Sequence, residues 1–157
     1  MSTFEHIFIR TDLDPAGLAA ELASLMGLEA SRDEAGKVYL SRPASDGRPG
    51  IIGGEIYGNS YTYPLDDPEE ESVIDGYNLV WDLGYSRRDR NVQLDESRRM
   101  FRDVTTLGRW PAVLLQGLDL LIAVWSPRSG YHEFPPGTSP DVDHRSLWEQ
   151  YRQTPST

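Results

Sequence analysis

The stretch FEHIFIRTDLDPAGLAAELASLMG, residues 4–27, contains two hydrophobic patterns in succession. Residues 4–11 alternate loosely between apolar and polar and are rich in aromatic and β-branched side chains, which predicts a β-strand. The larger apolar residues of the remainder recur at helical spacing, and they are Leu18, Leu22, Leu25 and Met26. A strand followed at once by an amphipathic helix indicates a fold in which helices pack on a sheet.

Local signals mark both ends of this helix. Asp14 is the predicted N-cap, and Pro15 occupies the first helical position, where its missing N–H costs nothing. Leu13 and Leu18 stand at the two positions of a hydrophobic staple. Gly27 supplies the C-terminal stop, so the helix is bounded on both sides.

Three further strands are predicted before the middle of the chain. Residues 28–32 and 37–42 form a hairpin that turns at 34–36. Residues 43–50, PASDGRPG, have the composition of a loop. Ile51–Gly58 is predicted to be a strand weakened by its glycines.

The cleanest alternation lies in GYNLVWDLGYSRR, residues 76–88. Every second residue of its centre is large and apolar or aromatic: Tyr77, Leu79, Trp81, Leu83 and Tyr85. This period of two predicts a strand with one buried face.

A second amphipathic helix is predicted from Asp95 or Glu96 to about Leu107, and Gly108 ends it. Next, PAVLLQGLDLLIAVW splits at Gly117 into the two short strands of a hairpin. The tail is rich in Pro, Gly and Ser and is predicted to be irregular as far as HRSLWEQYR, a short helix with Asp143 as a candidate cap. The residues expected to dock this helix on the body are Leu147, Trp148 and Tyr151.

The order of elements predicts a single α+β domain over residues 1–126, with residues 127–157 as a Pro/Gly-rich extension. We expect two layers: a mostly antiparallel sheet of about six or seven strands, and two amphipathic helices on one face. The succession strand, helix, hairpin occurs twice, which suggests two βαββ-like halves.

The charge and composition of the chain exclude or disfavour several classes of function. The net charge is −10 and the pI is about 4.7, which disfavours nucleic acid because that binding depends on Lys and Arg. The absence of cysteine excludes disulfides, thiolate catalysis and Cys-bound zinc. The first residues have no basic region followed by an apolar core, and the longest apolar stretch is too short to span a bilayer. We therefore expect a cytoplasmic protein that does not act at a membrane.

Acidic residues are concentrated in TYPLDDPEEESVIDG, residues 62–76, and three interpretations fit them. The first is a catalytic or metal site, but the stretch lacks the ligand spacing of a calcium loop. The second is a helix start, with Asp67 as N-cap, Pro68 at the first position and Glu70 completing a capping box. Two apolar residues would then pack inward, and Gly76 would end a two-turn helix.

The third interpretation is a protein-binding surface, because tyrosines precede the acids in IYGNSYTYP, residues 56–64. Tyrosine rings supply contact area at low entropic cost, and concentrated charge speeds association with a basic partner. The second and third interpretations are compatible, since capped acids still face outward. The candidate partner-binding residues are Tyr61, Tyr63, Asp66, Asp67, Glu69, Glu70 and Glu71.

No other motif indicates catalysis. The three histidines, His6, His132 and His144, lack metal-ligand spacing, and His6 is expected to be a packed or edge residue of a strand. The chain has no GxSxG elbow, no GxGxxG fingerprint and no P-loop lysine. We therefore expect no enzyme activity, no cofactor and no metal.

Three stretches resemble small bacterial immunity proteins encoded beside contact-delivered polymorphic toxins, including the swarming-inhibition type. They are TDLDPAGLAAELASLMGLE, SRRMFRDVTTL and AVLLQGLDLLIAVW, and the resemblance spans about residues 4–32 and 77–126. It implies a protein that blocks a cognate toxin domain, often a basic nuclease, by stoichiometric binding, with no catalytic residues. The alternative is an accessory or regulatory domain with another protein partner.

Overall fold

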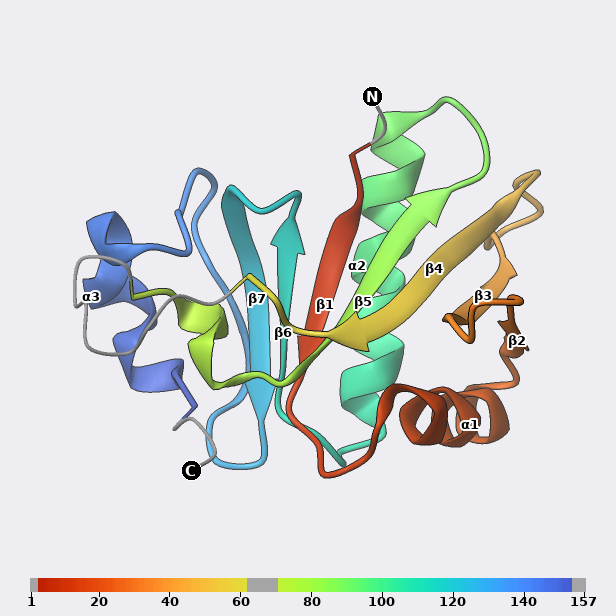
Figure 1. Ribbon diagram of the computed structural model, residues 1–157. Coiled ribbons are helices and arrows are strands. Elements are labelled where there is room, and N and C mark those ends of the chain that lie inside the picture. Colours follow the sequence, from red (N-terminus) through yellow and green to blue (C-terminus); the bar gives the residue numbers. More distant parts are fainter. Residues whose placement is uncertain (1–2, 62–70, 154–157) are drawn as a thin grey trace.

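Strand β1 lies near the centre of an eight-stranded antiparallel sheet with the order β2-β3-β4-β5-β1-β6-β7-β8 (Figure 1). The computed structural model describes residues 3–61 and 71–153. The strands are β1 (Glu5–Ile9), β2 (Glu29–Arg32), β3 (Val38–Pro43), β4 (Ile51–Gly58), β5 (Leu79–Tyr85), β6 (Ala112–Gln116), β7 (Leu120–Ser126) and β8 (Gly130–Glu133). The α+β class is confirmed, whereas the predicted count of six or seven strands is too low.

Helix α1 (Pro15–Met26) begins and ends where its local signals indicate. The Asp14 carboxylate accepts a hydrogen bond from the Gly17 N–H at 2.7 Å and so caps the first turn. Gly27 closes the helix in the left-handed conformation at φ 67°. Leu18 and Leu22 of this helix are fully buried.

Helix α2 (Arg90–Thr106) starts five residues before the predicted Asp95. Its N-cap is Asp89, whose carboxylate accepts from the Val92 N–H. The first turn escaped prediction because it is polar. Gln93 is nevertheless buried, and its amide donates to the Thr3 carbonyl and the Glu5 carboxylate.

Both long helices pack on the same face of the sheet, as predicted, and enclose the larger core. In Figure 1, α2 lies behind the central strands and α1 lies beside the β2–β4 end. Alternate residues of the central strands point into this core. The fully buried strand residues on this face include Ile7, Ile9, Leu40, Ile52, Trp81, Leu83 and Leu114.

A second core fills part of the opposite face, so the expectation of two layers and of one buried face on β5 is wrong. Phe8, Val80 and Val113 point away from the helices and are fully buried. They are covered by the 3-10 turn η2 (Val73–Gly76) and by the C-terminal segment. These segments form a third layer on the face opposite the helices, and Figure 1 shows α3 to the left of β7.

The tail is more ordered than its composition predicts. It contributes strand β8 and then the helical turns η3 (Val142–His144), α3 (Arg145–Trp148) and η4 (Glu149–Tyr151). Asp141, not the predicted Asp143, caps the first of these turns. Trp148 is fully buried in the second core, whereas the predicted anchor Leu147 is 40% exposed.

The two halves share an order of elements but occupy different places in the sheet. After α1 the chain enters at the outer edge with β2 and works inward to β4, which pairs with β5. After α2 it enters beside β1 with β6 and works outward to β8. The halves are therefore not related by a simple repeat of the sheet.

Among the residues that the structure describes, none of the helices is both long enough and apolar enough to cross a membrane.

Candidate partner-binding surface

Strand β4 ends at Gly58, and the structure describes the chain as far as Tyr61 and again from Glu71. The other predicted contact residues lie outside the described residues, and they are Tyr63, Asp66, Asp67, Glu69 and Glu70. Their predicted role stays a prediction, while Tyr61 and Glu71 can be placed.

Tyr61 is half-buried on the face opposite the helices. Its ring packs edge-on against Phe8 at 6.1 Å between centroids and lies 5.8 Å from the His6 ring. Its hydroxyl is 2.7 Å from the Tyr57 hydroxyl. The residue therefore anchors the start of the acidic stretch on the second core.

Beneath Tyr61 lies a polar network that the sequence did not reveal. The Asp82 carboxylate accepts from the Tyr57 hydroxyl and from His6 Nδ1, each at 2.8 Å. Burial, followed by the hydrogen bonds to Tyr61 and Asp82, raises the pKa of Tyr57 far above its usual range. His6 is packed, as expected, and Tyr57 stays protonated to hold the network together.

Glu71 fixes the other end of the stretch. Its carboxylate pairs with Arg145 at 2.5 Å and with Arg152 at 3.3 Å. The next residue, Ser72, caps η2 in a capping box completed by Asp75. The capping box predicted for Asp67 and Glu70 lies outside the described residues and stays a prediction.

The sheet face opposite the helices is only partly covered. We define the open face as the side of β2, β3 and β4 that points away from α1. Together with Phe4, which lies against it, the open face carries Glu29, Ser31, Tyr39, Ser41, Ile51, Gly53 and Glu55. Phe4 and Ile51 are 39% and 49% exposed, so apolar side chains contact solvent there.

Arginines neutralise acids mainly on the helix side and in the tail. The arginines that form ion pairs in the described chain are Arg42, Arg48, Arg90, Arg99, Arg102, Arg109, Arg145 and Arg152. Three of these paired arginines, Arg90, Arg99 and Arg102, lie on α2. Glu96 is fully buried and bonds the Ser45 hydroxyl at 2.9 Å and Arg48 at 3.1 Å.

The acids at the β2–β4 end have no such partners. No ion pair forms between a described Lys or Arg and any of Glu29, Asp33, Glu34 and Glu55. The Asp33 carboxylate instead closes the hairpin by accepting from the Lys37 N–H, and this bond lowers its pKa. The open face therefore borders carboxylates that form no ion pair within the described chain, with Lys37 as a nearby base that acts electrostatically on Asp33.

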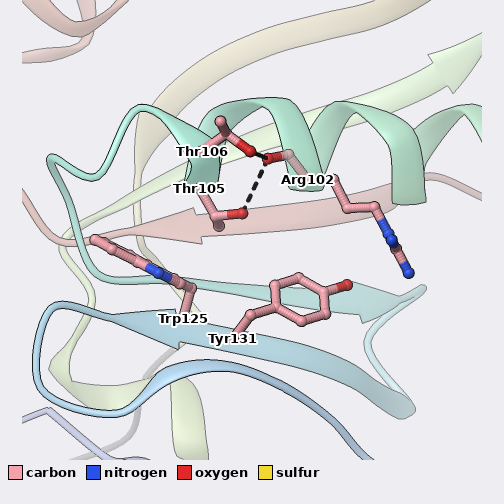
Figure 2. A pocket seen from close by; sticks show the side chains of 5 residues that line it. All are labelled: Arg102, Thr105, Thr106, Trp125 and Tyr131. Atoms are coloured by element: carbon pink, nitrogen blue, oxygen red, sulfur yellow. Dashed lines mark hydrogen bonds between the residues drawn. The ribbon is translucent and has the colours of Figure 1, made fainter.

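A pocket of about 350 Å³ opens where α2 ends above β7 and β8 (Figure 2). Trp125 and Tyr131 are paired across these strands and form its floor. The Arg102 guanidinium lies 5.5 Å from the Tyr131 ring centre and pairs with Glu133 at 3.1 Å. This arginine is thus held by the protein itself.

The other histidines do not converge with carboxylates. The His132 ring stacks on Tyr151 at 4.7 Å, and His144 Nδ1 accepts from the Ser139 N–H at 2.7 Å. Within the described ranges, 3–61 and 71–153, no group of three or more His, Asp or Glu is placed to hold a metal ion.

Comparison of the chain with family models, curated proteins and solved structures gave no match.

Proposed function

We propose that this chain is a non-enzymatic immunity protein that neutralises a cognate basic toxin domain by binding it directly. One observation carries the proposal. Arginines pair with acids on the helix side and in the tail, while acids at the β2–β4 end have no ion-pair partner in the described chain. The chain as a whole carries a net charge of −10, so its acids are not offset by an equal number of bases.

This excess of acids favours a basic partner for a physical reason. Exposed charges of one sign steer an oppositely charged protein during diffusion and raise the association rate, mostly at low salt. The two anchors of the acidic stretch, Tyr61 and Glu71, also lie on the side of the sheet opposite the helices. In the sequence, these two residues flank the other predicted contact residues.

The test uses the toxin domain encoded next to this chain's gene. The variant replaces Asp66 and Asp67 with Asn, and Glu69 and Glu70 with Gln; Glu71 is left intact because two arginines bind it. We expect association about tenfold slower at about 50 mM salt, and a flatter salt dependence. The melting temperature should stay nearly constant.

The control neutralises three exposed acids elsewhere, one charge fewer than the variant: Asp12, Asp119 and Asp143. It should change the association rate much less. Binding by the four-residue variant that equals wild type would exclude the acidic stretch as the recognition surface. If the chain neither binds the toxin domain nor restores growth of cells that produce it, the immunity function is wrong.

A further inference from the structure

We infer that the open face is a contact surface for the same basic partner, and this inference rests on the proposed function. The open face is uncovered because the segments that cover this side of the sheet pack on other strands. Turn η2 and the tail pack over Phe8, Val80 and Val113 of the central strands. No described segment packs over the corresponding side of β2 and β3.

The register of the strands determines which side chains are neighbours on this face. One row runs from Ser31 through Tyr39 to Glu55, and these are direct cross-strand neighbours. The next row runs from Glu29 through Ser41 to Gly53. Small residues thus form a floor between taller side chains.

Phe4 closes one end of the lower row. Its ring lies over Gly84 of β5, so closely that a Cβ there would approach it to 2.6 Å. Ile51 rises at one side, and Tyr39 and Glu55 rise at the other. Apolar and acidic groups therefore frame the same shallow surface.

The chemistry of this frame selects basic side chains. An arginine can place its charge on the Glu55 carboxylate while its plane stacks on the adjacent Tyr39 ring. Burial and the negative charges of Asp33 and Glu55 raise the pKa of Tyr39, so its ring stays neutral. Phe4 and Ile51 offer apolar contact beside it.

Basic groups of this chain flank the face and do not fill it. Lys37 lies in the β2–β3 turn beside Asp33, and Arg87 lies beyond the opposite end, near Gly50. The face is also modest in size, about 400 Å² from the strand spacing and rise. A standard interface takes about 800 Å² from each partner, so the partner would extend beyond it.

The test compares two double variants with the same change in charge. Ile51→Ser with Glu55→Lys alters the open face. Leu118→Ser with Asp119→Lys alters a turn on another part of the surface, where Leu118 is 40% exposed. We expect the first to weaken binding of the neighbouring toxin domain about tenfold and the second less than about threefold.

A probe independent of the toxin separates the two proposals. Isotope-labelled protein is titrated with a hexa-arginine peptide, and amide shifts are followed by NMR. Shifts at Tyr39 and Glu55 that the first variant abolishes would show that the open face binds basic side chains, whether or not the toxin domain is the partner.

Three outcomes overturn the inference. The first is equal toxin affinity of the two variants, which leaves the proposed function standing. The second is a peptide response without shifts on β3 and β4. The third is concentration-dependent self-association that the open-face variant removes, because the occupant would then be a second copy of this chain.

Discussion

Gly53 lies in β4 at φ 148°, a conformation that residues with a side chain rarely adopt. A Cβ there would also collide with the Leu40 carbonyl of β3. The sequence suggests only that glycines weaken this strand. In the structure this glycine is what permits β3 and β4 to approach.

We therefore expect Gly53→Ala to lower the free energy of unfolding by about 1–3 kcal/mol. The matched control is Gly58→Ala at the end of the same strand, where a Cβ meets nothing within 4 Å. Urea denaturation monitored by circular dichroism measures both. Equal stability of the two variants would show that β4 relaxes around the new methyl group.

At the residue scale, sequence predicts what depends on neighbours in the chain. The Asp14 cap and the Gly27 stop of α1 have their partners within four residues, and both are confirmed. Asp82 instead meets His6, 76 residues away, and in the strand pattern it is simply an outward polar residue. Glu96 is equally unremarkable until the loop after β3 folds over it.

At the scale of elements, hydrophobic periodicity located most of the strands and both long helices. It missed β8, because four residues, GYHE, are too few for an alternation to stand out within a Pro/Gly-rich tail. It also missed the first turn of α2, whose burial is polar. The tail contributes strand β8 to the sheet and side chains to the second core.

The packing of the tail on the sheet depends on Trp148. Its ring is fully buried in the second core, and its indole N–H donates to the Asp141 carbonyl at 2.9 Å. We expect Trp148→Ala to cost about 3–5 kcal/mol of unfolding free energy. Leu147→Ala, one residue away and exposed, should change it by less than about 0.5 kcal/mol.

Thermal and urea unfolding of the two variants give the comparison. A small loss for Trp148→Ala would mean that the tail is dispensable to the fold. In that case the second core would be held by η2 alone.

At the scale of the molecule, the order of the strands in the sheet could not be predicted from the sequence. Hairpins follow from short turns, but the pairing of β1 with β5 and β6 joins residues far apart in the chain. These strands have both faces buried, so the two cores share the same backbone. Loss of one core would therefore expose to water the strands on which the other core packs.

We therefore expect the two cores to unfold together. Trp81 reports on the first core and Trp148 on the second. In protein labelled with fluorotryptophan, the folded ¹⁹F signals of both should disappear at the same urea concentration. Two separate midpoints would mean that the layers behave as independent folding units.

The central place of β1 also constrains how the chain folds during synthesis. Residues 5–9 leave the ribosome before the residues with which they pair, 79–83 and 112–115. Until those residues emerge, the backbone groups of β1 can form hydrogen bonds only with water. Closing such long loops is slow, so the nascent chain carries an unpartnered apolar strand, and a chaperone that shields residues 5–9 would protect it from aggregation.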